Sequence, residues 1–290
     1  MKPIGNPLFK YPVIEDDSTA LEPTLLTDSV EWQPLSNIKE SGLVNVDRSL
    51  GGLWRRTSLG GKITVFFYID EQSQSDVDRS LRSLLRSTPS HLMELRVIRN
   101  NSNIDLGLIQ HIRGKKVYDV DYDGKYQAMY AAFHYHDKIE TPYAIWMDAS
   151  AELINDNWLN LLATVIVKQN PDVAAYGFKM KHSLNYQGSH RFPDWISKAR
   201  WYTGRPIRDD RSGTAGAGDT VHYCKDWFFV LLTKAIYDCD IPDIRLVDSA
   251  GDVVIGEQLY QNRYRIMSFN NRREFVDNSD SRSRVDYPWV

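Results

Sequence analysis

The sequence predicts an α/β fold built around a mainly parallel sheet. Residues 63–69 form an apolar run, Ile-Thr-Val-Phe-Phe-Tyr-Ile, and a second apolar run over residues 143–147 ends at Asp148. Between them, residues 77–85 have helical spacing and residues 92–98 form another apolar run. Strands that alternate with helices favour a parallel sheet, and such a sheet binds its ligands at the carboxyl ends of its strands.

The first elements follow from apolar spacing. Residues 63–69 are apolar on both faces, as expected of a buried parallel strand, and the run ends at Asp70. Val77, Leu81, Leu84 and Leu85 then share one helical face. The strand over 92–98 breaks at turn-forming asparagines.

The later elements are predicted in the same way. We expect helices over 126–136, 158–168, 227–236 and 255–262, strands over 143–148, 173–178 and 263–269, and irregular structure over 181–220.

Composition narrows the function classes. The chain has 290 residues, of which 42% are hydrophobic, enough for a sizeable core. Its net charge of −3 gives no global sign of a polyanionic partner. No apolar run approaches the length of a membrane span and the start does not resemble a signal peptide, so we expect a soluble, cytoplasmic chain without a membrane partner. No feature indicates an obligate protein partner. Cys224 and Cys239 are expected to be small buried hydrophobes.

Two acids are the strongest candidates for chemistry. Asp148 and Asp252 each adjoin an apolar run, and a run of this kind is typical of a buried parallel strand that delivers a carboxylate to a cleft. Each acid also has a plainer interpretation, as the N-cap of a helix or as a surface acid.

The order of motifs resembles the GT-A glycosyltransferases, in particular the inverting family 2 type, over residues 62–276. In the first half of the chain, the resemblance lies in the first strand with Asp70-Glu71 and in the turn Arg99-Asn100-Asn101-Ser102 after the second strand. It continues in Lys125-Tyr126-Gln127-Ala128-Met129 and in Met147-Asp148-Ala149-Ser150, which stands at the place of the Asp-x-Asp motif. The last motif is Asp252 followed by Leu259 at +7 and Ile266 at +14. Arg263 stands at +11, where many members of the family have Gly.

The resemblance implies a division of the chain. Residues 1–61, with five prolines, would be an N-terminal arm packed on the core. Residues 62–276 would be the catalytic domain, with a nucleotide-sugar-binding half over 62–152 and an acceptor-binding half over 153–276. Residues 277–290 would be a polar, mobile tail.

The resemblance also implies roles for individual residues. Asp252 would be the base that takes the proton of the acceptor hydroxyl. The donor, a UDP-sugar by preference, would be bound by Tyr68, Asp70, Asn100, Asn101, Lys125 and Asp148. Lys125 is equally well interpreted as a solvated surface lysine, and Asn100 and Asn101 as ordinary turn formers.

A divalent cation, Mn²⁺ or Mg²⁺, is left open by the sequence. Asp148 and Glu152 are the candidate ligands, but Ser150 stands where the second acid of Asp-x-Asp is usual, and Ser is a poor ligand for a hard cation. No histidine follows Asp252, although relatives often use a late one as a metal ligand. Arg99 also replaces the acid that usually binds uracil in the family, so two alternatives stay open: Asn100 binds the base, or the donor is not a uridine sugar.

The acceptor side is predicted from a basic, aromatic segment. Between Lys179 and Arg211 there are eight Lys or Arg and three Asp, interleaved with aromatic residues. Cations and rings in this arrangement are typical of a nucleic-acid groove. The acceptor candidates are Arg200, Trp201, Arg205 and Trp227. Trp227-Phe228-Phe229, Asp252 through Glu257 and Asn271-Arg272-Arg273 resemble viral sequences, and phage enzymes that glycosylate 5-hydroxymethylpyrimidines in DNA would suit a soluble chain of this kind. A folded loop whose arginines pair with local acids is the plainer interpretation.

Other functions remain open from the sequence. The acceptor may instead be interpreted as a surface polysaccharide or glycan. Ser150 is compatible with a non-catalytic GT-A-fold protein that only binds nucleotide or has a structural role. A nucleotidyltransferase is disfavoured, because Asp70-Glu71-Gln72-Ser73 lacks the Gly-rich loop that usually follows the first strand of that class.

Overall fold

The computed structural model describes residues 61–168, 171–183, 195–203, 220–246, 251–268 and 276–278. The residues it describes belong to one compact unit. The predicted arm over 1–61 and the tail after residue 278 lie outside the described residues, except for Gly61.

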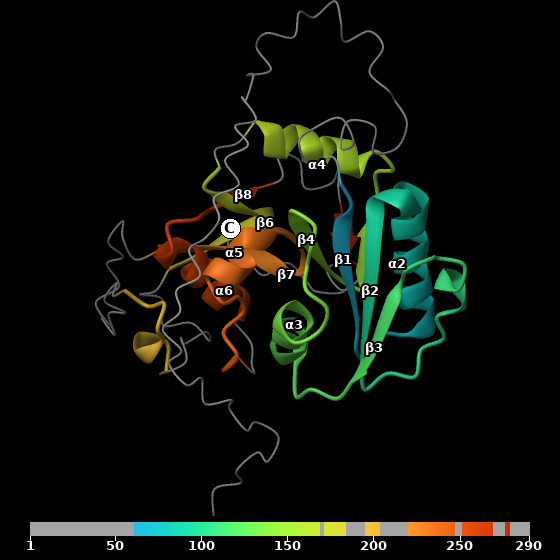
Figure 1. Ribbon diagram of the computed structural model, residues 1–290, viewed down its shortest axis with the longest axis horizontal. Coiled ribbons are helices and arrows are strands. Elements are labelled where there is room, and N and C mark those ends of the chain that lie inside the picture. The colour runs from blue at the N-terminus through green and yellow to red at the C-terminus, as the bar shows by residue number, and fades with distance from the viewer. Residues whose placement is uncertain are drawn as a thin grey trace, which may run out of the picture. The chain divides into compact units, whose positions relative to one another are not determined.

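A mainly parallel seven-stranded sheet forms the centre of the fold, so the predicted α/β class is confirmed (Figure 1). The strand order is β3-β2-β1-β4-β7-β6-β8. The strands are β1 (Ile63–Ile69), β2 (Met93–Asn100), β3 (Lys116–Val120), β4 (Tyr143–Asp148), β6 (Val173–Ser183), β7 (Thr220–Leu232) and β8 (Arg265–Ser268). Only β7 among them runs against the others, since it pairs antiparallel with both β4 and β6.

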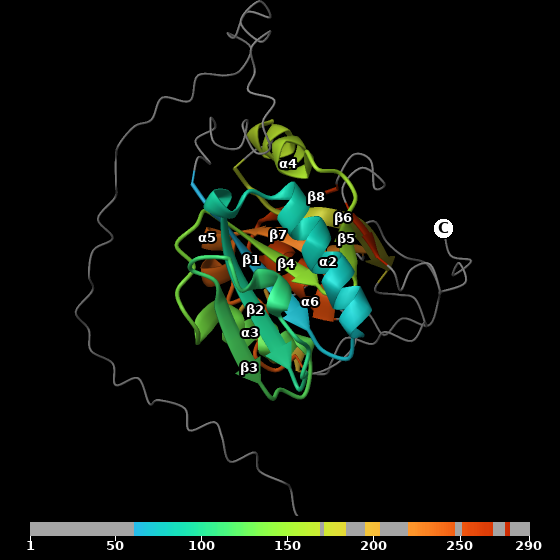
Figure 2. The same ribbon diagram turned by 90° about the vertical axis from the view of Figure 1, so that its right-hand side faces the viewer.

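Helices cover both faces of this sheet (Figures 1 and 2). Helices α2 (Gln74–Ser87) and α4 (Trp158–Val167) pack on one face, and α3 (Lys125–His134), α5 (Thr233–Asp238) and α6 (Gly251–Gln261) pack on the other. Successive side chains of β1 point to opposite faces of the sheet. Val65 and Phe67 pack in the core under α2 and α4, and Phe66 and Tyr68 pack in the core under α3, α5 and α6.

Helix α2 illustrates how the sequence specifies an element. Ser73 is its N-cap, and its hydroxyl accepts a hydrogen bond from the backbone N–H of Asp76, which satisfies one of the free donors of the first turn. Val77, Leu81 and Leu84 lie one helical turn apart and are buried against the sheet. The helix predicted from these residues is confirmed.

Most predicted elements are confirmed within a few residues, but the predicted helix over 227–236 is wrong. Residues 227–232 are the second half of β7, and the helix α5 begins only at Thr233. A short apolar run has no period that distinguishes a buried strand from a buried helix. Pairing with β4 and β6 on both sides decides for the strand, which suits its aromatic and β-branched residues.

A second correction concerns Asp252, which is not at the end of a strand. It lies in the first turn of α6, which begins at Gly251 rather than at Ile255. A third concerns the predicted tail, because Asp277 and Asn278 are part of β9 (Val276–Asn278). This strand pairs with β5 (Ala151–Leu153) in a small antiparallel sheet, so backbone hydrogen bonds order these polar residues.

Two glycines let α6 approach its neighbours closely. A Cβ atom at Gly256 would lie 2.2 Å from the carbonyl oxygen of His222 in β7, and one at Gly251 would lie 2.3 Å from the ring of Tyr126 in α3. No larger residue fits either contact without movement. The first turn of α6 is therefore held against both α3 and β7.

Candidate functional site

The predicted donor residues meet at the carboxyl ends of three parallel strands. Tyr68 lies near the end of β1, Asn100 ends β2 and Asp148 ends β4. Tyr68 is in register with Asp148. This is the edge at which parallel sheets place their ligands. The topology of the sheet therefore brings these residues together, although they are far apart in the sequence.

Tyr68, Asp70 and Asn100 form one hydrogen-bonded group. The Tyr68 hydroxyl donates to Asp70 Oδ2 at 3.0 Å and accepts from Asn100 Nδ2 at 3.2 Å. The Asn100 amide is also bonded to the backbone of Tyr122 in both directions. Burial, with the Asp70 charge adding to it, raises the pKa of Tyr68 and keeps its phenol protonated. Asn100 thus fixes the segment after β3.

Asn101 and Arg99 flank this group. Asn101 is exposed and adopts φ 52°, a left-handed conformation that asparagine tolerates better than most residues. The Arg99 guanidinium binds the carboxylate of Asp119 with two nitrogens. Of the two turn asparagines, Asn101 is the one with a solvent-facing side chain.

Lys125 connects Asp148 to a second acid that the sequence analysis did not single out, Asp226. The Lys125 ammonium donates to Asp148 Oδ2 at 2.6 Å and to Asp226 Oδ2 at 2.9 Å. The other oxygen of Asp148 accepts from the indole N–H of Trp146 at 2.9 Å. Lys125 is therefore not a solvated surface lysine, and Asp148 is neither an N-cap nor a surface acid, since it is 5% exposed.

Asp252 joins the same network through Tyr126. The Tyr126 hydroxyl donates to Asp226 Oδ2 at 3.3 Å and accepts from the backbone N–H of Asp252 at 3.0 Å. A continuous chain of contacts thus runs from Asp148 through Lys125, Asp226 and Tyr126 to Asp252. The two acids singled out from the sequence lie on one side of the sheet and at one site.

Electrostatics separates the three carboxylates. Burial, with the negative charge of Asp226 adding to it, raises the pKa of Asp252 to about 7. Burial also raises the pKa of Asp148 to about 6, although Lys125 opposes it. For Asp226, burial is opposed by the Lys125 ammonium together with the Tyr126 hydroxyl and the charge of Lys225, and these hold the pKa of Asp226 below its usual value. Near pH 7, the Asp226 carboxylate is ionised, while Asp252 is present in both its protonated and its ionised form.

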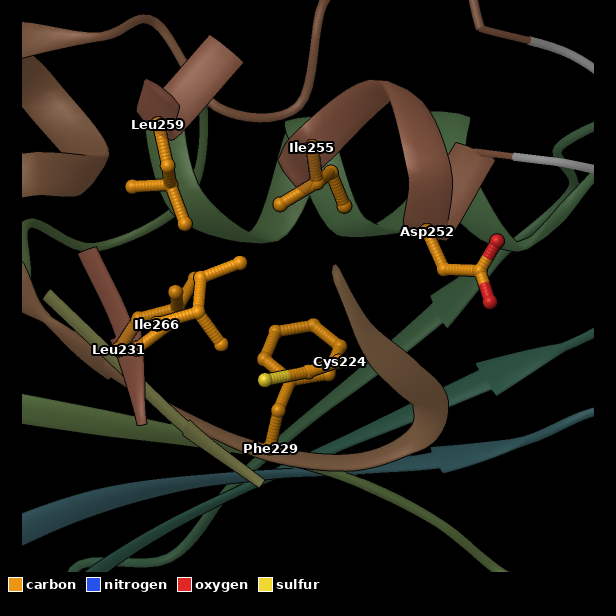
Figure 3. A pocket seen from close by; sticks show the side chains of 8 residues that line it. Cys224, Phe229, Leu231, Asp252, Ile255, Leu259 and Ile266 are labelled. Carbon is orange, nitrogen blue, oxygen red and sulfur yellow. The ribbon is translucent and has the colours of Figure 1, made fainter. Parts of the chain in front are cut away.

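A small cavity lies behind Asp252, between α6 and the sheet (Figure 3). Its lining is apolar apart from Asp252 and the Cys224 thiol: Ala175, Cys224, Phe229, Leu231, Asp252, Ile255, Leu259 and Ile266. Figure 3 shows the Asp252 carboxylate at one end, directed away from Ile255 and Leu259. The apolar packing beneath the acid explains its raised pKa. Cys224 and Cys239 are free and buried, as predicted.

Glu152, the second candidate metal ligand, is not part of this network. Its carboxylate lies 3.5 Å from Arg79 of α2. Among the residues that the structure describes, no group of three or more His, Cys, Asp and Glu is arranged to hold a metal ion.

The acceptor candidates are placed differently from one another. Arg200 is exposed. The Trp201 indole donates to Asp243 Oδ2 at 2.9 Å and is partly buried against the core of α3, α5 and α6. Trp227 packs on Phe178 with ring centroids 4.7 Å apart. Arg205 lies outside the described residues.

Asp226 and Tyr126 are the residues that sequence reasoning missed. Asp226 directly precedes the apolar run Trp227-Phe228-Phe229, which is the same signal, an acid next to an apolar run, that singled out Asp148. It was missed because that run was interpreted as a helix. Tyr126 belongs to the motif Lys125-Tyr126-Gln127-Ala128-Met129, but nothing in the spacing of the sequence indicates that its hydroxyl reaches residue 252.

Comparison with known proteins identifies structural neighbours only. No protein-family model and no curated protein matches the sequence. Solved structures to which this chain is similar include S. aureus TarS 1–349, with 18% identity and a TM-score of 0.47, covering 74% of this chain and 59% of that one. TarS 1–349 in complex with UDP-GlcNAc is also similar, with 18% identity, a TM-score of 0.45 and coverage of 74% and 57%.

A third neighbour is the mannosyltransferase PcManGT from Pyrobaculum calidifontis in complex with GDP-Man and Mn²⁺. It is 13% identical, with a TM-score of 0.44 and coverage of 73% of this chain and 55% of that one. The chain thus spans less than two thirds of the length of these neighbours.

No helix among the described residues has both the length and the apolar character of a membrane span.

Proposed function

We propose that the chain is an inverting glycosyltransferase that moves a sugar from a nucleotide sugar to a hydroxyl group. One observation carries this proposal: the hydrogen-bonded chain that joins Asp148 to Asp252 through Lys125, Asp226 and Tyr126. It combines a cation suited to a diphosphate with a carboxylate whose pKa suits a base near neutral pH.

The reaction places each group in a role. The acceptor oxygen forms a bond to the anomeric carbon while the bond from that carbon to the diphosphate oxygen breaks, and the acceptor proton passes to the Asp252 carboxylate. A general base is most effective when its pKa lies near the working pH, as the value of about 7 for Asp252 does. The nucleoside diphosphate leaves with added negative charge, which the Lys125 ammonium stabilises.

The donor side follows from the strand ends. The Lys125–Asp148 pair lies next to the end of β1, where Tyr68, Asp70 and Asn100 form their group. We assign the nucleoside to this group and to the exposed Asn101. The sugar would then lie between Asp148 and Asp252, with a UDP-sugar as the first donor to test.

For the acceptor, we propose a 5-hydroxymethylpyrimidine in DNA. Cations lie close to the proposed base, because Lys225 is near enough to Asp252 to lower its pKa, against the effect of burial. Exposed Arg200 belongs to the basic, aromatic segment between Lys179 and Arg211. Positive charges beside the base suit a polyanionic acceptor. Trp201, already bonded to Asp243, would serve to hold this segment in place.

Release of nucleoside diphosphate tests the reaction. A panel of UDP-, GDP- and dTDP-sugars is incubated with the protein alone, with hydroxymethylated DNA, with unmodified DNA and with a glycan acceptor. Release that requires hydroxymethylated DNA supports both parts of the proposal. Release only with the glycan keeps the glycosyltransferase and replaces the acceptor. No release with any pair contradicts glycosyl transfer.

Charge reversal tests the DNA acceptor separately. We expect Arg200→Glu to weaken DNA binding and to reduce the dependence of that binding on salt, because each phosphate contact releases counterions. Arg82→Glu is the matched control, since Arg82 is exposed on α2 at the opposite face of the sheet. Equal DNA binding by the wild-type protein and both variants would remove the support for DNA.

A further inference from the structure

Lys125 lies between two carboxylates of the proposed donor site. Its ammonium lies within hydrogen-bond distance of Asp148 and Asp226 at once, at 2.6 and 2.9 Å. The Lys125 side chain is only 22% exposed and that of Asp148 only 7%. The two carboxylates reach this point from neighbouring strands, β4 and β7.

The acids that the structure describes around Lys125 do not fit a divalent cation in addition to this lysine. Both oxygens of Asp148 are engaged, one by Lys125 and the other by Trp146. Glu152 faces Arg79, and Ser150 stands at the place of the second acid. Mg²⁺ and Mn²⁺ prefer several oxygen ligands, and a positive ammonium next to the same carboxylates would repel them.

We propose that Lys125 is the resident cation of the site, which takes the place of a divalent ion between Asp148 and Asp226 and supports the departing diphosphate without a metal. This inference rests on the proposed function, because it names the charge that assists the leaving group of that reaction.

The chemistry of the ammonium suits this role. A lysine ammonium has three N–H donors, of which two are directed to Asp148 and Asp226; among the described residues nothing accepts from the third, which can serve a phosphate oxygen. The two carboxylates outweigh burial and raise the pKa of Lys125, so the group keeps its charge at physiological pH. No proton leaves Lys125 during transfer, since the acceptor proton goes to Asp252.

Binding of Mn²⁺ to the protein without donor gives a test that does not depend on activity. Electron paramagnetic resonance measures free Mn²⁺ during titration of the wild-type protein, Lys125→Ala and Lys125→Arg. Removal of the ammonium leaves two carboxylates with space between them. We therefore expect Lys125→Ala to bind Mn²⁺ about tenfold or more tighter than the wild type, given the strength of charge–charge interactions at this distance.

Two controls make the result specific. Lys125→Arg keeps the positive charge and is expected to bind Mn²⁺ as weakly as the wild type. Asp226→Asn in the Lys125→Ala background is expected to remove the new affinity. Circular dichroism and thermal melting verify that each variant is folded. Equal Mn²⁺ affinity in the wild type and Lys125→Ala, including no binding by either, would overturn the inference.

Turnover provides the second arm. With an active donor and acceptor, we expect the rate of nucleoside diphosphate release to be unchanged by EDTA and not raised by Mn²⁺, and to fall about 100-fold or more in Lys125→Ala, the usual scale for the loss of a charge-stabilising group. A rate that requires Mn²⁺ would overturn the inference and keep the proposed function. No release from any donor would contradict the proposed function, and the Mn²⁺ titration would still decide the inference.

Discussion

The backbone N–H of Asp252 donates a hydrogen bond of 3.0 Å to the hydroxyl of Tyr126, which lies 126 residues earlier in the chain. The hydroxyl in turn donates to Asp226. Tyr126 therefore links the first turn of α6 to Asp226, the acid that also accepts a hydrogen bond from Lys125. It sets where the Asp252 carboxylate stands relative to the donor side.

Removal of the Asp252 carboxylate should stop turnover without loss of donor binding. We expect Asp252→Asn to lower kcat by about 100-fold or more, the typical contribution of a general base. Calorimetry should find nucleotide affinity close to that of the wild type. Unchanged turnover in Asp252→Asn would contradict its role as the base. A protein that binds nucleotide but has no activity even as the wild type would instead fit a non-catalytic GT-A-fold protein.

The pH dependence of the reaction should follow the pKa of Asp252. A base must be deprotonated to act, so kcat/KM should rise with pH and level off above about 7. Asp226 raises this pKa, whereas Lys225 and Lys125 lower it. Tyr126 and Tyr223 also face Asp252, but their own raised pKa values keep them neutral in this range. Asp226→Asn should therefore move the rise in kcat/KM to lower pH, and an unmoved profile would exclude this coupling.

The raised pKa of Asp252 also determines how the free energy of unfolding changes with pH. The Asp252 carboxyl keeps its proton in the folded state up to about pH 7, while an unfolded aspartate loses it near 3.8. The folded state thus binds more protons between these values, and the free energy of unfolding falls as pH rises through this window. Asp252→Asn should reduce that slope in urea denaturation from pH 4 to 7.5. An equal slope in both proteins would contradict the raised pKa.

Loss of the Tyr126 hydroxyl should impair positioning more than binding. Tyr126→Phe removes both hydrogen bonds of the link and keeps the buried ring. We expect kcat to fall about tenfold, with little change in KM for the donor, since a displaced base weakens catalysis rather than donor binding. Tyr130→Phe, on the same helix and partly exposed, is the control. Equal kcat in the two variants would show that the link is not needed.

Gly251 should not tolerate a side chain. A Cβ atom would lie 2.3 Å from the ring of Tyr126, which is buried, so that the ring or the helix would have to shift. We expect Gly251→Ala to lower the melting temperature and the activity together, since overpacking usually destabilises by about 1–3 kcal/mol. Gly107→Ala is the matched control because its Cβ would meet only the exposed Asp105 carboxylate, at 3.2 Å. Similar melting temperatures for both variants would contradict the close contact.

The sequence by itself determined the alternation of strands and helices and the acid at the end of β4, and it marked Asp252 as a candidate, because apolar periodicity and local turn chemistry depend on neighbouring residues. It did not determine that 227–232 is an antiparallel strand, because a short apolar run fits both helix and strand. Only the tertiary structure brought Asp226 and Tyr126 between Asp148 and Asp252. Their meeting depends on β7 pairing beside β4 and on α6 packing against α3, and such contacts between distant residues have no local signal in the chain.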